Sequence, residues 1–141
     1  MATFVAPNNG NWTNTGSEEY QYGLNGNDIL APNNDNKSYF LYGGSGNDEL
    51  IGQSYNDELY GGAGSDLLYG DYGNDYLNGG NGKDYFAFDT MLDNKQNVDT
   101  IADFKSGTDE IWLSKSIFKG AGNKETYLKS SKFEVGKSAT S

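Results

Sequence analysis

Three residue types that carry much of protein chemistry are missing from this 141-residue chain: cysteine, histidine and arginine. Without cysteine the chain can form neither a disulfide nor a thiolate metal site. Without histidine it lacks the commonest general base and the commonest ligand of transition metals. Without arginine it lacks the bidentate clamp for phosphate groups. The composition therefore argues against redox, zinc and phosphate chemistry.

The chain is also poor in apolar residues. Only 35% of its residues are hydrophobic, whereas glycine contributes 20 residues, so a conventional core would be difficult to bury. No apolar run approaches the roughly 20 residues of a transmembrane helix. The N-terminus lacks the basic and apolar regions of a Sec-type signal peptide. We expect a protein of one domain with no membrane span.

The net charge of −10 makes some classes of binding partner unfavourable and others favourable. Such a charge opposes binding to nucleic acid and to anionic membrane surfaces. It favours cations as partners instead.

What the sequence does contain is a repeat of nine residues. Aspartates recur at this interval, each followed two residues later by a large apolar residue, and glycine opens each unit. The aspartates are Asp48, Asp57, Asp66, Asp75 and Asp84, and the apolar residues are Leu50, Leu59, Leu68, Leu77 and Phe86. An earlier unit at 23–30 carries Asp28 and Leu30, and a longer, degenerate unit separates it from Gly43. A fixed short period of this kind is typical of solenoids.

The unit can be written G-G-x-G-x-D-x-U-x, where U is a large apolar residue. We expect its first six residues to form a turn, because glycine permits positive φ, and its last three to form a short strand. Two units would make one coil of 18 residues. Successive coils would stack as parallel strands about 4.8 Å apart, with the apolar residues inside. The sequence therefore predicts an all-β protein, a parallel β-roll.

This stacking predicts two columns of aspartates. Units two apart lie on the same side, so Asp28, Asp48, Asp66 and Asp84 form one column and Asp57 and Asp75 form the other. Carboxylates stacked at this spacing repel one another unless a cation lies between them. Calcium fits because it takes oxygen ligands at 2.3–2.6 Å in flexible geometry, whereas magnesium demands shorter bonds and a stricter octahedron.

The repeat resembles that of the RTX (repeats-in-toxin) family, whose nonapeptide binds calcium. The segments 98–104 (VDTIADF) and 107–114 (GTDEIWLS) are similar to the segment that follows RTX repeats and caps the roll. The resemblance implies a right-handed β-roll at 23–87, an N-terminal lead-in at 1–22 and a C-terminal cap at 88–141. It also makes Asp99 and Asp109 candidate calcium ligands, although both could be ordinary surface acids.

The predicted calcium site combines the repeat aspartates with the turn residues around them. Because Gln53, Tyr55 and Asp71 replace turn glycines, we expect about four or five Ca2+ ions. The turn residues in the prediction are Gly26, Gly44, Gly46, Gly62, Gly64, Gly73, Gly80, Gly82, Asn27, Asn47, Asn56 and Asn74.

The resemblance implies a biological setting as well. RTX proteins are typical cargo of type I secretion, unfolded in the low-calcium cytosol and folded outside the cell. We therefore expect an extracellular module that is part of, or derived from, a larger secreted protein. Relatives often continue with further strands and a C-terminal secretion signal, so we expect a shortened chain.

Several tyrosines should lie on the outer faces of the strands, and two interpretations of them stay open. They could form a polysaccharide-binding surface of a carbohydrate-binding or accessory module in a secreted polysaccharide-modifying enzyme or adhesin. They could instead steady the roll by cross-strand packing. No nucleophile elbow, HExxH or phosphate loop is present, so we expect no enzymatic activity. The tyrosines are Tyr42, Tyr60, Tyr69, Tyr76 and Tyr85.

Overall fold

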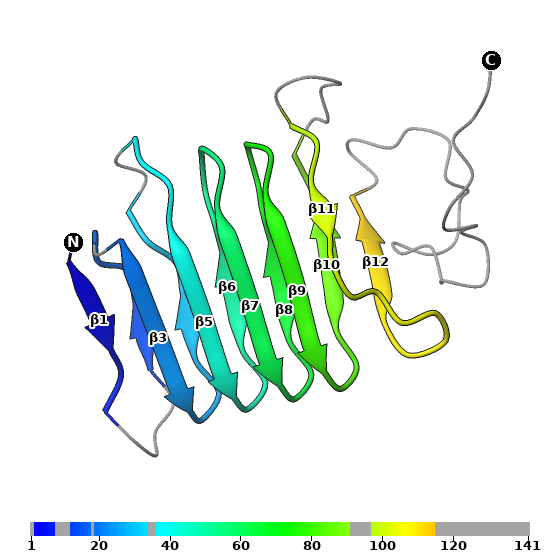
Figure 1. The fold of residues 1–141 in the computed structure, drawn as a ribbon, viewed down its shortest axis with the longest axis horizontal. Helices are drawn as coiled ribbons and strands as arrows, with labels where there is room; N and C mark the ends of the chain where they lie inside the picture. Colours follow the sequence, from blue (N-terminus) through cyan, green and yellow to red (C-terminus); the bar gives the residue numbers. More distant parts are fainter. Residues whose placement is uncertain (1, 8–11, 18, 34–35, 91–96, 115–141) are drawn as a thin grey trace.

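The computed structural model describes residues 2–7, 12–17, 19–33, 36–90 and 97–114. These residues form two parallel sheets of six strands each, which face one another along the length of the molecule (Figure 1). They contain no helix, so this part of the chain has no helix that could cross a membrane. The predicted all-β parallel solenoid is confirmed.

The chain alternates between the two sheets as it coils. Sheet A contains β1 Thr3–Val5, β3 Tyr20–Asn25, β5 Phe40–Ser45, β7 Glu58–Ala63, β9 Tyr76–Asn81 and β11 Thr100–Ile101. Sheet B contains β2 Thr13–Asn14, β4 Ile29–Leu30, β6 Glu49–Ile51, β8 Leu67–Tyr69, β10 Tyr85–Phe88 and β12 Glu110–Leu113.

The core is a double row of leucines between the sheets. Within sheet A, Leu41 pairs with Leu59 and Leu59 with Leu77. Within sheet B, Leu50 pairs with Leu68. All these side chains are fully buried, as is Phe86 at the end of the row. One apolar residue per strand therefore suffices for a core, because every strand gains neighbours from the coils beside it.

One prediction about the repeat is wrong. The first glycines of a unit were expected to lie in turns, but in sheet A the strand continues through them, as in β7 Glu58–Ala63. Gly44, Gly62 and Gly80 pair in register along sheet A despite positive φ at each. They can do so because glycine has no Cβ to collide with the coil beside it. The turns leading from sheet A to sheet B are correspondingly short.

The two ends of the described solenoid differ from its middle. At the N-terminal end, β1 pairs with β3 and β2 with β4, and the core positions hold Gln21 and Asn14 in place of leucine. At the C-terminal end, Ile101 and Phe104 pack against the leucine row. The predicted boundaries of lead-in, roll and cap stay predictions, and residues 115–141 of the cap lie outside the described residues.

Candidate metal centre

The first column of aspartates lies at the turns that lead from sheet A into sheet B. Asp28 accepts a hydrogen bond at Oδ1 from the backbone N–H of Trp12 (2.7 Å), and each later carboxylate accepts one from the column residue one coil nearer the N-terminus. Asp48 accepts from Asp28 N (2.8 Å), and Asp66 accepts from Asp48 N (2.8 Å). Asp84 continues the series by accepting from Asp66 N (3.1 Å). Residues 18 or 20 apart in the sequence are thereby linked along the solenoid axis.

The second column lies at the turns that lead from sheet B back into sheet A. Asp57 accepts from the N–H of Tyr39 (2.7 Å), and Asp75 accepts from that of Asp57 (2.8 Å). Asp99 then accepts from Asp75 N (3.0 Å), so it stands where the next repeat aspartate would be. The structure therefore brings the predicted aspartates together in the two predicted columns.

The second carboxylate oxygen of each repeat aspartate, Oδ2, indicates what the columns could bind. Oδ2 is buried and has no hydrogen-bond donor in Asp28, Asp48, Asp57, Asp66, Asp75 and Asp84. A buried carboxylate oxygen without a donor is costly unless a proton or a cation compensates it. These six atoms are therefore the strongest indication that the columns bind cations.

Burial changes the acidity of these carboxyls. In the first column it raises the pKa of Asp48 to about 6 and that of Asp66 to about 7. In the second column it raises the pKa of Asp57 to about 8 and that of Asp75 to about 7. Asp99 lies beside Asp75, and the two carboxyls can bond to each other only when one of them is protonated. Without a compensating charge, burial therefore shifts the carboxyls of both columns toward the protonated form.

Backbone carbonyls complete the donor set. The carbonyl oxygen of Gly44 faces Gly62 of the next coil, 2.2 Å from where a Cβ would lie. That of Gly46 faces Gly64 at 1.7 Å from the same point. Any side chain at these glycines would collide with the coil beside it. The repeat therefore packs the carbonyl oxygens of one turn closely against the glycines of the next.

These donors suit a hard cation. Among the described residues, no three acidic side chains converge closely enough to hold a metal by themselves. Carboxylate and carbonyl oxygens together, however, are the donor set that calcium prefers. The geometry fits ions that are held between coils by one or two aspartates and by turn carbonyls. The glycines of the predicted site all adopt positive φ, as this arrangement needs.

The asparagines of the predicted site accept backbone hydrogen bonds from the next coil. Asn27 accepts at Oδ1 from Asn47 N (2.8 Å), and Asn47 accepts from Ser65 N (2.8 Å). In the second column, Asn56 accepts from Asn74 N (2.9 Å), and Asn74 accepts from Val98 N (2.9 Å). These bonds run in the opposite direction to those of the aspartates. They explain asparagine before aspartate as an inter-coil link, while its role as a metal ligand stays a prediction.

The C-terminal cap ends the first column with residues outside the repeat. Asp109 accepts from Asp84 N (3.1 Å) and, at its other oxygen, from Lys105 N (2.7 Å). Both of its oxygens therefore have donors, unlike those of the repeat aspartates. Its role as a calcium ligand, like that of Asp99, stays a prediction.

Two cap residues were not predicted as part of the site. Asp103 accepts from Gly79 N (2.9 Å) and Gly80 N (2.7 Å), and the ammonium of Lys105 donates to the Gly80 carbonyl. Their spacing does not follow the nine-residue period, so the repeat gave no signal for either.

A further acidic contact in the second column was also missed. Asp71, which replaces a turn glycine, lies beside Asp89, and burial together with Asp89 raises the pKa of Asp71 to about 6. The hydroxyl of Thr90 donates to the carbonyl of Asp71 (2.7 Å). The only feature of the sequence that pointed to this contact was the aspartate at position 71, where the repeat has glycine.

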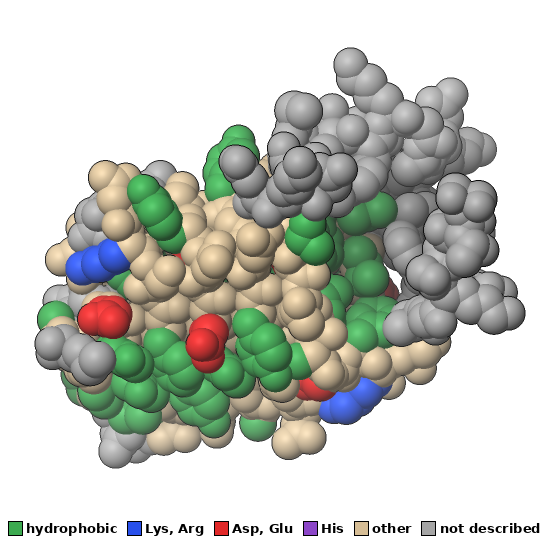
Figure 2. Space-filling view, turned by 45° about the horizontal axis from the view of Figure 1, so that its top comes forward, with side chains coloured by type: hydrophobic (Ala, Val, Ile, Leu, Met, Phe, Trp, Pro, Cys, Tyr) green, Lys and Arg blue, Asp and Glu red, His purple; other side chains and the backbone are tan. Residues whose placement is uncertain are grey.

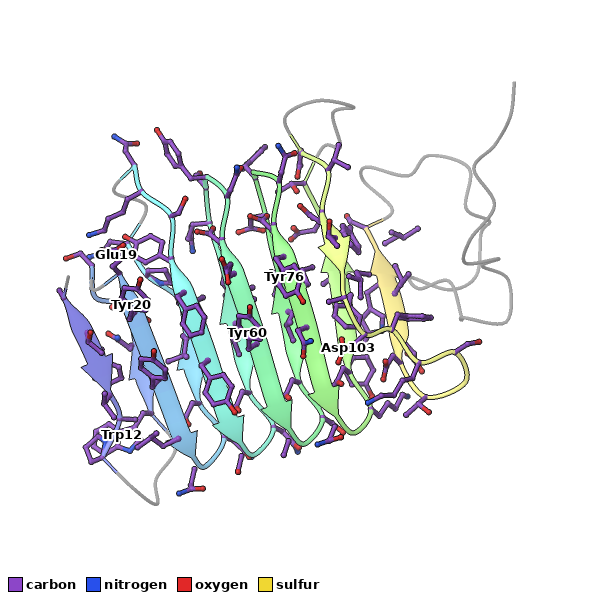
Figure 3. The ribbon with its side chains drawn as sticks, in the orientation of Figure 1. Trp12, Glu19, Tyr20, Tyr60, Tyr76 and Asp103 are labelled. Atoms are coloured by element: carbon purple, nitrogen blue, oxygen red, sulfur yellow. The ribbon has the colours of Figure 1, made fainter. Side chains whose placement is uncertain are left out.

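The predicted tyrosines lie on the outer faces, divided between the sheets. Tyr60 of sheet A contacts Phe40 and Tyr76, with ring centroids 5.1 and 5.7 Å apart. Figure 3 shows Tyr20, Tyr60 and Tyr76 in a row across this sheet, and Figure 2 shows hydrophobic side chains gathered on one face with acidic ones among them. On sheet B, Tyr85 packs against Trp112 at 4.7 Å. These contacts agree with cross-strand packing, and ligand binding by the tyrosines stays a prediction.

Comparisons with known proteins agree with this geometry. A family model described as the C-terminal region of serralysins, peptidase family M10, matches residues 23–139. The matched region is the repeat-containing part of that peptidase family and not its catalytic part. No curated protein and no solved structure gave a match.

Proposed function

Because the chain belongs to the serralysin C-terminal family, which is the RTX calcium-binding β-roll region, we propose that it is a β-roll module that folds on binding Ca2+. The observation that carries the proposal is the pair of aspartate columns, whose six buried Oδ2 atoms lack donors. Asp28, Asp48, Asp66 and Asp84 would hold ions in one column, and Asp57 and Asp75 in the other. We keep the estimate of about four or five ions.

The mechanism couples ion binding to folding. Without a cation, the stacked carboxylates repel one another and are desolvated, while a core of one residue per strand offsets little of this cost. A bound ion supplies the missing partner of Oδ2 and joins two coils at once. Its binding free energy then becomes folding free energy, as in other small metal-dependent domains.

This coupling suits a module of a secreted protein. The chain would stay unfolded in a low-calcium cytosol, pass through a type I secretion channel and fold in the calcium-rich exterior. The family supports a location outside the cell, and attachment to a larger secreted protein follows the same reasoning. The module itself would bind ions and catalyse no reaction.

The first test is a calcium titration followed by far-UV circular dichroism, with magnesium as the control. We expect a cooperative gain of β signal with calcium and little change with magnesium. A chain that already shows its full β signal in chelator, and gains no thermal stability from calcium, would contradict the proposal.

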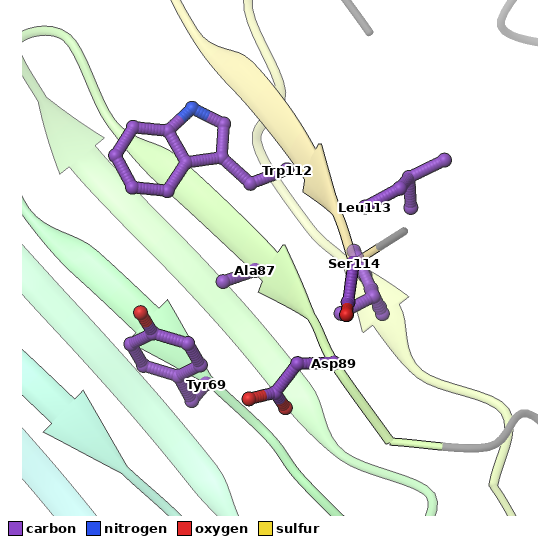
Figure 4. A pocket seen from close by; sticks show the side chains of 7 residues that line it. Tyr69, Ala87, Asp89, Trp112, Leu113 and Ser114 are labelled. Carbon is purple, nitrogen blue, oxygen red and sulfur yellow. The ribbon is translucent and has the colours of Figure 1, made fainter. Parts of the chain in front are cut away.

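A second candidate function is carbohydrate binding, favoured by one pocket on sheet B. Tyr69 and Trp112 flank the small Ala87, and Asp89 and Ser114 lie beside them (Figure 4). The pocket has a volume of about 180 Å³. Two aromatic rings with a carboxylate nearby could stack on and hydrogen-bond to a sugar ring.

A polysaccharide pull-down would separate the two functions. If the pocket binds sugar, Tyr69→Ala should abolish retention, whereas Tyr60→Ala on the opposite sheet should keep it. Equal retention of both variants, or no retention of the wild type, would leave ion binding as the function.

A further inference from the structure

A series of backbone carbonyls runs along the first column. The carbonyl oxygens of Leu24, Gly44 and Gly62 each face the second residue of the next turn, at Gly44, Gly62 and Gly80. Each lies 2.1–2.2 Å from where a Cβ would be built at the facing glycine. In three successive gaps, therefore, the facing glycine lets the next coil approach the carbonyl so closely that no side chain would fit between them.

The fourth gap is built differently. It lies between the turn at 79–84 and the cap turn at 103–109. Here the Gly80 carbonyl, next in the series, accepts a hydrogen bond from the ammonium of Lys105. Asp103 lies in the same gap and accepts the N–H groups of Gly79 and Gly80. A positive charge thus sits on a carbonyl that, unlike the three before it, has no glycine of a further repeat unit facing it.

Lys105 is held beside the column by its own backbone. Its N–H donates to Asp109, whose other carboxylate oxygen accepts the N–H of Asp84. The side chain of Lys105 therefore begins next to the last turn of the column.

We infer that Lys105 is a resident cation that takes the place of a calcium ion in the last gap of the first column. Metal binding would then stop at the turn of Asp84, and the C-terminal end of the roll would need no ion. This inference rests on the proposed function, since it concerns which gaps of that column bind calcium.

The test is the number of calcium ions bound, measured by native mass spectrometry on the full chain refolded with calcium. Lys105→Ala should bind one ion more than the wild type, because it removes the ammonium from the Gly80 carbonyl and its positive charge from the gap. Lys105→Arg keeps a cation and should match the wild type. Lys83→Ala is the matched control, because Lys83 belongs to the same end of the roll but pairs with Glu110 at 2.6 Å.

The outcomes are distinguishable. An unchanged ion count in Lys105→Ala, with calcium bound by the wild type, would overturn the role of Lys105 alone. An extra ion in Lys83→Ala as well would overturn it too, because loss of any lysine would then suffice. If no variant binds calcium, the proposed function fails and this inference fails with it. Should Lys105→Ala not fold, Lys105→Gln replaces it in the count with the same expectation.

Discussion

The two aspartate columns use the same nonapeptide, but they build it from different residues. In the first column, the second and fourth turn positions are nearly all glycine, with Leu24 as the exception. In the second column, Gln53, Tyr55 and Asp71 occupy the same positions, and they too adopt positive φ. The backbone conformation is therefore common to both columns, although the residues are not.

The difference shows what the glycines are for. Positive φ alone does not require glycine, since a tyrosine tolerates it at position 55. Close approach of the next coil does, because Gly64 faces the Gly46 carbonyl with no room for a Cβ. Within the second column, the turn one coil before that of Tyr55 belongs to the longer, degenerate unit, and Tyr55 is 49% exposed. Packing between coils thus dictates glycine at most of these positions in the first column and at Gly73 of the second, where the Tyr55 carbonyl oxygen lies 1.9 Å from an added Cβ, whereas Gln53, Tyr55 and Asp71 of the second column carry backbone strain.

Placing a side chain between coils of the first column should have the largest effect. In Gly64→Ala the new Cβ would lie 1.7 Å from the Gly46 carbonyl oxygen, at a φ of 140°. We expect loss of more than about 4 kcal/mol of stability, enough to unfold the roll. The measurement is thermal unfolding in calcium by circular dichroism.

Gly107→Ala is the matched control, because Gly107 has a φ of 90° but no atom within 4 Å of an added Cβ. It should lose only about 1–2 kcal/mol, from backbone strain. Equal losses in the two variants would show that φ, and not the approach of the next coil, dictates glycine in the first column.

Acidity should substitute in part for calcium. The folded-state pKa of Asp57 is raised to about 8 and that of Asp66 to about 7, well above the unfolded value near 3.8. Protonated aspartates therefore favour the roll below about pH 4, and this stability is lost as the pH rises to about 8. In chelator, we expect the roll to gain on the order of several kcal/mol on going from pH 8 to pH 5. Far-UV circular dichroism in chelator at a series of pH values measures this as a gain of β signal on acidification, and a flat or opposite trend would contradict it.

Removing one carboxylate charge compares the columns directly. Asp57→Asn and Asp48→Asn each keep an oxygen to accept the inter-coil N–H bond. In chelator at pH 8 both should stabilise the roll, and Asp57→Asn should do so by on the order of 1–3 kcal/mol more, because the pKa of Asp57 is about 8 and that of Asp48 about 6. In calcium both should destabilise it, since each would remove a proposed ligand. The β signal in chelator and chemical denaturation in calcium would together reveal this change of sign, and its absence would argue against metal binding at that column.

Much of this arrangement could be predicted from the sequence, because the repeat that sets each local turn and strand also sets which residues of successive coils lie beside one another. The period of nine places Leu50 and Leu68 in the core and aligns Asp48 with Asp66. Once a coil of two units is assumed, the leucine core and the aspartate columns both follow from the nine-residue spacing. The continuation of sheet A through Gly61 and Gly62 did not follow, because glycine normally signals a turn and pairing in register depends on the neighbouring coil.

The remaining features lie where the period ends. Asp103 and Lys105 act on the last repeat turn from a segment with a different spacing, so no repeat position pointed to them. Asn47 stays a predicted residue of the metal site, and the repeat did not predict that its Oδ1 accepts the N–H of Ser65 in the next coil. Such contacts depend on the stagger between coils, which composition and period do not specify.

The smallest effect tests the strain of the second column. Tyr55 has a φ of 77°, which costs a residue with a Cβ about 1–2 kcal/mol, while glycine adopts it freely. Glycine also adds entropy to the unfolded chain, so the net gain from Tyr55→Gly should be no more than about 1 kcal/mol. Tyr72→Gly is the control, because Tyr72 is another exposed tyrosine of this column but has no positive φ. Thermal unfolding in calcium should show Tyr55→Gly at or above the wild type and Tyr72→Gly below it. If both variants lose equal stability, the tyrosine side chain at position 55 contributes as much as its backbone costs, and strain would not distinguish the second column from the first.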